Sequence, residues 1–260
     1  MVTAIFRRQE IKNKKQQFSA GVYCLFLFII ISLFISPTGI VSAQQVNYEQ
    51  ISTEITTYFR AARAVISDNQ DLINNPDIGN KDLTATKVEE MAKNKYYDMT
   101  SMPLPFNESV VALTNAIRSV MDQAQDNINK PGVRYKNFLP AVFAKKVADA
   151  FNREMRDKMF IKLTAPSTYV RNLANHPDSW EATVLDTRFS LPTWTKGKAF
   201  FEENLHRGKQ AFRFILPEYY GNSCLKCHGE PKGSLDITGG RTEGGKLGEL
   251  GGAISLAIYK

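Results

Sequence analysis

Two cysteines and a histidine near the C-terminus have the residue types and the spacing for covalent attachment of a cofactor. They stand in the sequence Cys224-Leu225-Lys226-Cys227-His228, the C-x-x-C-H pattern typical of c-type haem. This spacing lets both sulfurs reach the vinyl groups on one porphyrin face. The adjacent histidine is then held under the iron, for which imidazole is a suitable ligand. The pattern predicts one covalent haem c, with thioethers at Cys224 and Cys227 and His228 as the proximal iron ligand.

Zinc, a redox dithiol and a disulfide are the alternatives for this motif. A structural zinc site needs four protein ligands, and the sequence lacks a second C-x-x-C or a histidine pair at zinc spacing. A thioredoxin-like dithiol would open a helix in a βαβ setting, which the neighbouring sequence does not have. A disulfide leaves His228 without a role, so haem accounts best for all three residues.

The glycine-rich stretch 239–248 follows the motif. It lacks the Gly-Lys-Ser/Thr of a phosphate-binding loop and precedes a predicted strand. We expect its glycines to let the backbone bend closely past a flat cofactor.

The N-terminal residues 1–43 have the pattern of a secretory signal peptide. Five basic residues and one acid precede the apolar run 22–35, and Val41-Ser42-Ala43 offers small residues for cleavage. The alternative is a retained membrane anchor, although the apolar run is shorter than the ~20 residues that span a bilayer. We expect a periplasmic protein, anchored to the membrane if the segment is not cleaved.

Composition and charge exclude several classes of protein. The 260 residues are 43% hydrophobic and 23% charged, proportions typical of a globular protein rather than a disordered chain or polytopic membrane protein. The net charge of +7 falls to +3 when the five basic residues and one acid of 1–43 are removed. No polybasic block remains, so we expect no nucleic-acid partner. Cys24 lies in the apolar run, which leaves Cys224 and Cys227 in the mature chain.

Hydrophobic periodicity predicts helices first and short strands later. The predicted helices cover 48–73, 86–97, 109–128 and 141–155. The predicted strands cover 159–164, 209–216 and 252–259, with a hairpin partner near 198–205 joined through a turn at 206–209. This order favours an α+β fold with an antiparallel sheet.

The segment 63–76 resembles the segment 118–131 at a constant offset of 55, and the match extends to Lys81 against Lys136. One interpretation is a duplicated helix-plus-turn unit. The other is that two amphipathic helices with similar caps are alike by chance. Two copies are fewer than the roughly three repeats that a solenoid needs, so we infer no array.

Three ordered stretches resemble a family of single-haem c-type proteins with a PAS-like sensor fold. The family occurs as soluble haem proteins and as periplasmic input regions of chemoreceptors and histidine kinases. The stretches are IKLTAP (161–166) with VRNLANHPDSWE (170–181), LPEYY (216–220) with CLKCHGEP (224–231), and GELGGAIS (248–255).

The resemblance implies a PAS-like antiparallel sheet that carries the haem over residues 106–260. It implies an N-terminal helical region over 44–105, whose long amphipathic helices mediate a homodimer. It also implies that Arg171 and Asn172 lie near the haem. Some members use a cysteine thiolate as the sixth iron ligand, but this chain has no cysteine left for that role.

The sixth ligand has several candidates. Met155 and Met159 precede a predicted strand, and a thioether is a known axial ligand, although methionine also serves as core filler. His176 lies in the loop that carries Arg171, where an ordinary surface histidine is the alternative. An open iron is a further alternative.

Other polar residues are candidates for contacts at the edge of the haem or for the protein surface. Arg171 and Lys162 are candidates for pairing with the haem propionates, and ordinary surface salt bridges are the alternative. His206, in the predicted turn, is expected to be solvated.

Three functions fit these features. We expect a haem-based redox or gas sensor module, which passes its signal to a separate partner protein. A periplasmic electron-transfer cytochrome c with a separate redox partner is the alternative. We expect no enzyme; a peroxidase would need a distal acid–base group, for which His176 and His206 are the histidines on offer.

Overall fold

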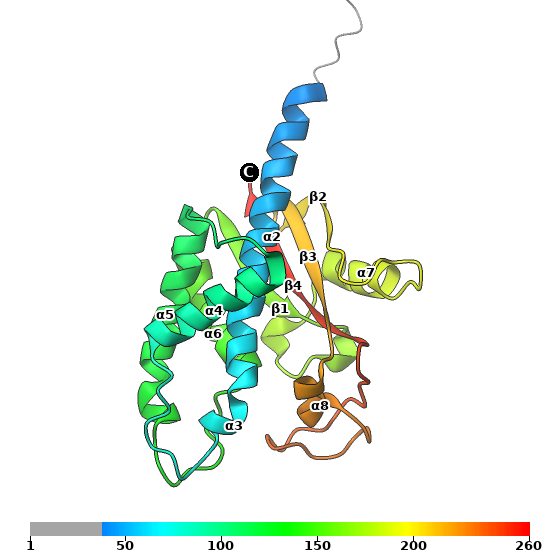
Figure 1. Ribbon diagram of the computed structural model, residues 1–260. Coiled ribbons are helices and arrows are strands. Elements are labelled where there is room, and N and C mark those ends of the chain that lie inside the picture. Colours follow the sequence, from blue (N-terminus) through cyan, green and yellow to red (C-terminus); the bar gives the residue numbers. More distant parts are fainter. Residues whose placement is uncertain (1–37) are drawn as a thin grey trace, which may run out of the picture. The chain divides into compact units, whose positions relative to one another are not determined.

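A computed structural model describes residues 38–260, with side chains from residue 47 (Figure 1). The predicted signal segment therefore lies outside the described residues, apart from 38–43, which belong to a helix. The helices are α2 (Thr38–Asp68), α3 (Gln70–Ile73), α4 (Ala85–Thr100), α5 (Glu108–Ile128), α6 (Pro140–Glu154), α7 (Ser179–Val184) and α8 (Asn222–His228). The strands are β1 (Met159–Thr164), β2 (Phe200–His206), β3 (Lys209–Tyr219) and β4 (Leu250–Tyr259). Within the described part, none of the helices has the length and apolar character needed to cross a membrane.

Local sequence signals set the ends of the long helices. The side chain of Asn107 accepts a hydrogen bond from the amide of Val110 at 3.0 Å and caps the start of α5. Pro140 stands at the first helical position of α6, where its missing N–H costs nothing. The predicted helix 48–73 is divided at Asn69, since α2 ends at Asp68 and α3 begins at Gln70.

The strands form a four-stranded antiparallel sheet in the order β1-β4-β3-β2. The antiparallel α+β prediction is confirmed. The hairpin turn between β2 and β3 is Arg207-Gly208, with φ of 53° and 77°; two residues of positive φ match the twist of the flanking strands. The last strand, β4, runs between β1 and β3, so residues at the end of the chain hold the sheet together.

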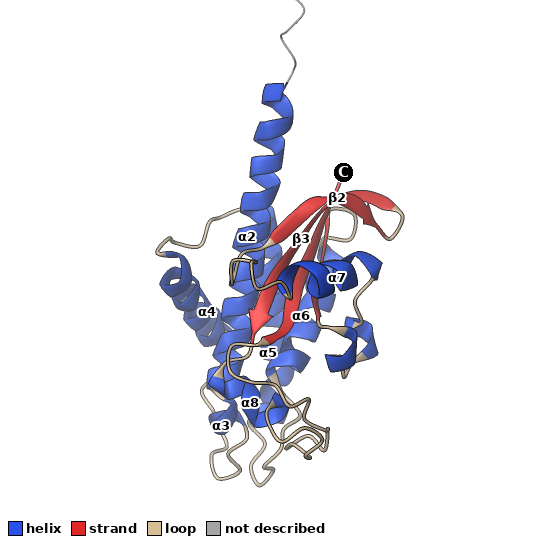
Figure 2. Cartoon of the chain, turned by 90° about the vertical axis from the view of Figure 1, so that its right-hand side faces the viewer, coloured by secondary structure: helices blue, strands red, loops and turns tan. Residues whose placement is uncertain are grey.

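The two faces of the sheet carry different layers. Alternating residues Phe212, Phe214 and Leu216 of β3 face the large core that α2, α4, α5 and α6 complete. Ile215, on the other face, packs with Trp180 in a smaller core under α7 (Figure 2). Residues 47–260 form one unit, and the large core joins the N-terminal helices to the strands. The predicted boundary at 105–106 does not coincide with a break in this core.

The internal similarity at an offset of 55 corresponds to two turns that bond to each other reciprocally. The amide of Lys136 donates to Oδ1 of Asn74 at 3.1 Å, and the amide of Lys81 donates to Oδ1 of Asn129 at 2.9 Å. Both lysine side chains are buried; the ammonium group of Lys81 donates to two backbone carbonyls of its own turn, and that of Lys136 donates to one.

A second reciprocal pair has the same offset. Nε2 of Gln70 donates to the carbonyl of Phe138 at 3.0 Å, and Nε2 of Gln125 donates to the carbonyl of Leu83 at 3.0 Å. Two helices that are alike only by chance would not be expected to form reciprocal hydrogen bonds at matching positions. The reciprocity supports the interpretation as a duplicated helix-plus-turn unit.

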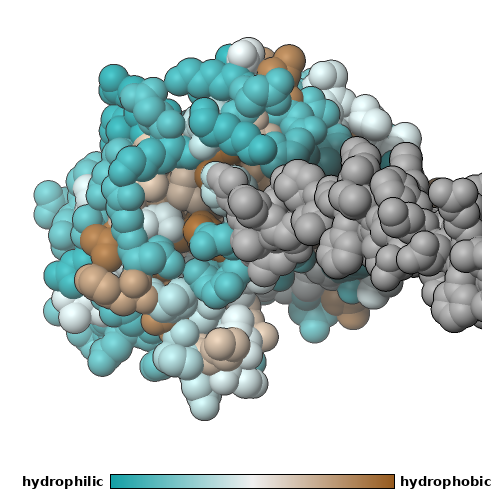
Figure 3. Space-filling view, turned by 90° about the horizontal axis from the view of Figure 1, so that it is seen from above, coloured by the Kyte–Doolittle hydropathy of each residue, from teal (hydrophilic) through white to brown (hydrophobic). Residues whose placement is uncertain are grey.

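The view from above shows one face of the molecule (Figure 3). Among the coloured residues, hydrophilic side chains cover most of this face, and hydrophobic ones appear as separate patches between them. This face therefore presents mainly polar and charged groups.

Candidate functional site

The C-x-x-C-H motif forms the short helix α8, directly after β3 at one end of the sheet (Figure 2). Tyr220 connects the two elements; its amide donates to the carbonyl of Glu249 at 2.9 Å, and its carbonyl accepts from Gly248 at 2.8 Å. These bonds fix the start of α8 against the beginning of β4. Cys224 and Cys227 lie one helical turn apart, both half-buried and not joined in a disulfide.

Tyr220 also explains the glycines after the motif. A Cβ atom at Gly245 would lie 2.4 Å from the Tyr220 ring, and one at Gly251 would lie 2.5 Å from it. The same ring stacks on His228, with 5.5 Å between the ring centroids and 21° between the planes. Gly245 of the glycine-rich stretch and Gly251 of β4 therefore pass closely over a tyrosine ring. That the stretch also passes a bound cofactor stays a prediction.

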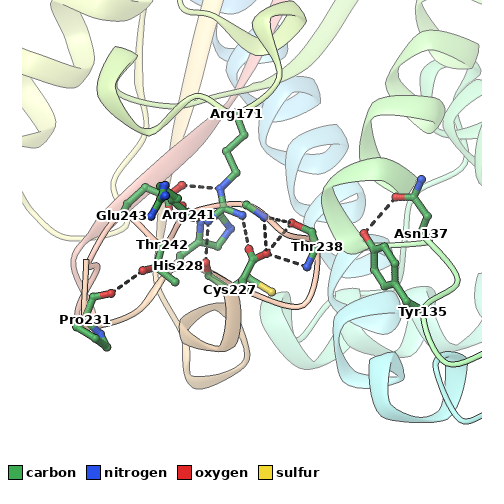
Figure 4. A network of polar contacts seen from close by, with 12 residues as sticks. Tyr135, Asn137, Arg171, Cys227, His228, Pro231, Thr238, Arg241, Thr242 and Glu243 are labelled. Carbon is green, nitrogen blue, oxygen red and sulfur yellow. Dashed lines mark hydrogen bonds and ion pairs between the residues drawn. The ribbon is translucent and has the colours of Figure 1, made fainter. Parts of the chain in front are cut away.

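A carboxylate holds the histidine of the motif. Nδ1 of His228 lies 2.7 Å from Oε2 of Glu243, in the loop between α8 and β4 (Figure 4). The amide of Gly245 donates to the carbonyl of His228 at 2.7 Å and keeps this loop against the helix. With Nδ1 engaged as the donor, Nε2 is the ring nitrogen available to a metal.

Arg171 connects the motif to two of the acidic groups in the loop. Its Nε donates to Oε1 of Glu243 at 2.6 Å, its Nη1 pairs with Asp236, and its Nη2 donates to the carbonyl of Cys227 at 2.7 Å (Figure 4). The Asp236 side chain is fully buried, and that of Glu243 is 9% exposed. One guanidinium group therefore fixes α8, the carboxylate that orients His228, and the loop around them.

The charges of this network determine the protonation of its members. Burial alone would raise the pKa of Asp236, but hydrogen bonds from Thr238 and Arg171 outweigh burial and lower the pKa to about 2. Burial likewise opposes ionisation of Glu243, and the bonds from Arg171 and His228 hold its pKa below the usual range. Both acids are therefore carboxylates at neutral pH.

The N-terminal helices contact α8 from another side. Oγ of Ser67 on α2 lies 3.1 Å from Oγ of Ser223, and Lys226 pairs with Asp71 of α3 at 3.1 Å. Arg63 of α2 pairs with Glu218 at the end of β3. Burial lowers the pKa of Arg63 to about 10, and the neighbouring Cys224 opposes this effect. A movement of α8 would therefore change its contacts with α2 and α3.

The other predicted haem-contact residues lie at different places. Asn172 is exposed, and its side chain accepts from the amide of Ala174 at 3.0 Å. Lys162 pairs with buried Glu181 at 2.8 Å and donates to the carbonyl of His176 at 2.8 Å. Of the three predicted contacts, the structure brings only Arg171 to the motif. Its pairing with a propionate stays a prediction.

The predicted distal candidates are distant from α8 or exposed. Met155 and Met159 are both 4% exposed and belong to the large core. Met159 pairs with Ile258, which pairs with Phe212, so it lies about 23 Å along the sheet from the end of β3, at about 3.3 Å per residue. His176 is exposed, and its Nδ1 lies 3.0 Å from the carbonyl of Pro177. The structure brings none of these three side chains to the motif.

His206 is buried, and the expectation of a solvated turn histidine is wrong. It is 5% exposed, lies between the rings of Phe160 and Tyr259, and has Nδ1 2.8 Å from the Tyr259 hydroxyl. Burial, followed by the charge of Arg213, lowers the pKa of His206 to about 4. The reason is that His206 is the last paired residue of β2, opposite Lys209, and not part of the turn itself.

Sequence reasoning missed Glu243, Asp236 and Tyr220. The loop between α8 and β4 contains four acids, and nothing in their spacing distinguishes Glu243 from Glu230 or Glu249. The one available signal was the position of Tyr220, four residues before Cys224.

The donor set of α8 fits a c-type haem. Two half-buried sulfurs stand one turn apart, and His228 is oriented by Glu243 with its Nε2 free for iron. Among the residues that the structure describes, no group of three or more His, Cys, Asp or Glu side chains could by itself hold a metal ion.

The fold and this site define an α+β domain that presents a C-x-x-C-H helix at the end of an antiparallel sheet, with its histidine held by a carboxylate. The chain belongs to the Tll0287-like family, whose sequence model matches residues 42–258. No curated protein and no solved structure matches the chain.

Proposed function

We propose that the chain is a haem-based redox or gas sensor module of the periplasm, with one haem c bound to Cys224 and Cys227 through thioethers and to His228 through Nε2. The donor set of α8 supports the cofactor, and the family is known as a haem-binding, cytochrome-like domain. The strand order and the helices on one sheet face support a PAS-like fold. The basic and apolar N-terminal sequence supports export.

The contact between α8 and the N-terminal helices carries the sensor proposal. Ser223 and Lys226 of the motif helix are bonded to Ser67 of α2 and Asp71 of α3. A sensor needs such a connection, because a change at the iron must alter an element that a partner can recognise. In this proposal α2 is that element, whether in a homodimer or against a separate signalling protein.

The bound haem supplies an iron that exchanges one electron and takes diatomic ligands. The residues of the chain set how that iron behaves. Glu243 holds the tautomer and orientation of His228. Arg171 holds Glu243 and the carbonyl of Cys227 together, so that the proximal ligand and the thioether helix move as one body.

Electron transfer is the second candidate, and exposed apolar side chains favour it. Leu235, Ile237 and Leu247 in the loop after α8 are 69%, 58% and 64% exposed. Apolar residues around a redox centre are typical of a transient docking surface. A redox partner protein would then replace the signalling partner.

Absorbance spectra of the holoprotein, made in a host that matures c-type cytochromes, test the proposal. Oxidised, reduced, and reduced carbon-monoxide spectra should show haem c whose reduced form binds carbon monoxide if the module senses gas. A low-spin haem that does not bind carbon monoxide supports redox sensing or electron transfer. Hydrogen exchange then distinguishes these two functions. A change in the exchange of α2 on reduction supports redox sensing, and no change supports electron transfer. A protein without covalent haem contradicts the whole proposal.

A further inference from the structure

A basic cavity lies far from the motif, at the free edge of the sheet. It has a volume of about 470 Å³, within the range of roughly 300–1,000 Å³ typical of small-molecule sites. The C-terminal half of α6, strand β1, the short 3-10 helix Leu173–Asn175 and the hairpin turn at Arg207 enclose it. None of its lining residues belongs to α8 or to the loop that follows it.

Positive charge dominates the lining of this cavity. The basic residues are Lys145, Arg153, Arg156, Lys162 and Arg207. Among the lining residues, all within the described chain, Asp149 is the only acid, and it is paired with Lys145 at 2.5 Å. A concave wall of one sign concentrates the electrostatic field inside it and attracts counter-ions.

Three guanidinium groups of the lining have no acidic partner among the described residues. Lys145 and Lys162 are neutralised by Asp149 and Glu181. The side chains of Arg153 and Arg156 form no ion pair or hydrogen bond with the described residues. The guanidinium group of Arg207 lies over the Phe160 ring, 3.9 Å from its centroid. Arginine forms two parallel hydrogen bonds with a carboxylate or phosphate, so this triad can bind several oxyanion groups at once.

We propose that this cavity is a binding site for a small multivalent oxyanion, a compound with two or more carboxylate or phosphate groups. Arg153, Arg156 and Arg207 bind the charged groups. The ring of Phe160 and the side chains of Ala148 and Ala174 provide an apolar wall for the body of the ligand. The site is independent of the haem and lies on a different element from the motif.

The position of the three arginines predicts what binding does to the domain. Arg153 is on α6, Arg156 follows it, and Arg207 is in the turn between β2 and β3. A ligand held by all three connects α6 to the sheet at its edge. In the structure, the Asn152 side chain already joins α6 to β1, because it bonds to both the amide and the carbonyl of Ile161. Ligand binding therefore adds to the stability of this packing.

Calorimetric titration of the holoprotein at low ionic strength tests the site, with citrate and pyrophosphate as multivalent probes and acetate as the monovalent control. We expect saturable binding of one equivalent of citrate or pyrophosphate, no measurable binding of acetate, and weakening of the binding by added sodium chloride. Absence of saturable binding by both multivalent probes overturns the proposal.

Charge-removing variants locate the site. The double variant Arg153→Gln/Arg156→Gln should weaken binding by about 10- to 100-fold, because it removes two charge-assisted contacts. Lys146→Gln is the matched control, since Lys146 is an exposed residue of the same helix outside the cavity. Undiminished binding by the double variant, with its thermal unfolding unchanged, places the anion elsewhere and overturns the proposal.

A membrane surface is the other source of clustered phosphate groups. Sedimentation with vesicles of phosphatidylglycerol and phosphatidylcholine separates it from a soluble ligand. Citrate or pyrophosphate binding without sedimentation supports a small-molecule site. Sedimentation that depends on Arg153 and Arg156, without binding of either soluble probe, overturns the small-molecule proposal in favour of a lipid contact.

Discussion

Nδ1 of His228 lies 2.7 Å from Oε2 of Glu243, and the other oxygen of that carboxylate is bonded to Nε of Arg171 at 2.6 Å. The Glu243 side chain is 9% exposed and that of His228 is 34% exposed, so the carboxylate side of this contact is shielded from water. The geometry is that of a histidine held by a carboxylate, an arrangement that increases the electron donation of the imidazole to a metal. In the proposed haem protein this contact would influence the reduction potential of the iron.

Replacing Glu243 by Gln should raise the midpoint potential of the haem. The neutral amide leaves the shape of the contact but donates less charge to His228, so the ferric state loses stabilisation relative to the ferrous state. We expect a shift on the order of 60 mV, equivalent to a tenfold change for a one-electron couple. Spectroelectrochemical titration measures it. Glu230→Gln, an exposed acid of the same loop, is the control; equal potentials in both variants would show that Glu243 has no influence on the iron.

Removing the motif cysteines should abolish covalent attachment. Each of Cys224→Ala and Cys227→Ala leaves one thioether, which shifts the α-band of the pyridine haemochrome to longer wavelength. The double variant leaves none, and haem staining on a denaturing gel should disappear. Cys24→Ala serves as the control because this residue lies in the N-terminal segment. Haem staining retained in the double variant would contradict thioether attachment at these positions.

Arg171→Met should destabilise the loop between α8 and β4. The substitution leaves the fully buried carboxylate of Asp236 without its cation, and the Asp236 pKa of about 2 would rise. We expect a loss of about 2 kcal/mol, measured by urea unfolding at pH 7, and faster proteolysis within the loop. Arg241→Met, an exposed arginine of the same loop, should have little effect. If the two variants are equally stable, the buried pairing contributes nothing.

The sequence predicted those parts of the fold that depend on local pattern. The strand predicted at 159–164 matches β1 residue for residue, because apolar residues alternate there at strand period. The helix predicted at 109–128 begins within one residue of α5, where Asn107 caps it. The break at Asn69 was missed, since an amphipathic period continues through it.

The parts of the site that could not be predicted depend on contacts between distant segments. Glu243 meets His228 only because the intervening loop folds back, with Gly245 bonded to the carbonyl of His228 and packed on Tyr220. Arg171 comes from a different part of the chain, and only the family resemblance pointed to it. His206 was misjudged because the rings that bury it, Phe160 and Tyr259, belong to other strands.

The buried His206 should make folding stability depend on pH. Its folded pKa of about 4 lies below the ordinary value of 6.5, so the folded protein keeps the ring neutral while the unfolded chain binds a proton. Stability is therefore full above pH 6.5 and falls as the pH decreases toward 4, by about 1 to 3 kcal/mol. Urea unfolding at pH 4.5 and 7.5 measures the fall.

His206→Gln should reduce this pH dependence, since glutamine does not titrate. The exposed His176→Gln is the matched control and should show the wild-type slope. An identical slope in the His206 variant and the wild type would mean that other groups cause the loss of stability in acid.

The reciprocal turns of the duplicated unit should contribute equally to stability. Asn74 and Asn129 each accept the backbone amide of the lysine that follows the opposite turn, so alanine at either position leaves one half-buried N–H without a partner. We expect each substitution to cost about 1 to 2 kcal/mol by urea unfolding. Asn80→Ala removes a similar side-chain bond to the exposed amide of Asp82, where water can replace it, and should cost much less. A large difference between the two alanine variants would show that the turns contribute unequally to stability although their bonding is equivalent. Two small losses of stability would mean that water satisfies these amides, so that the fold does not depend on the bonds between the two copies.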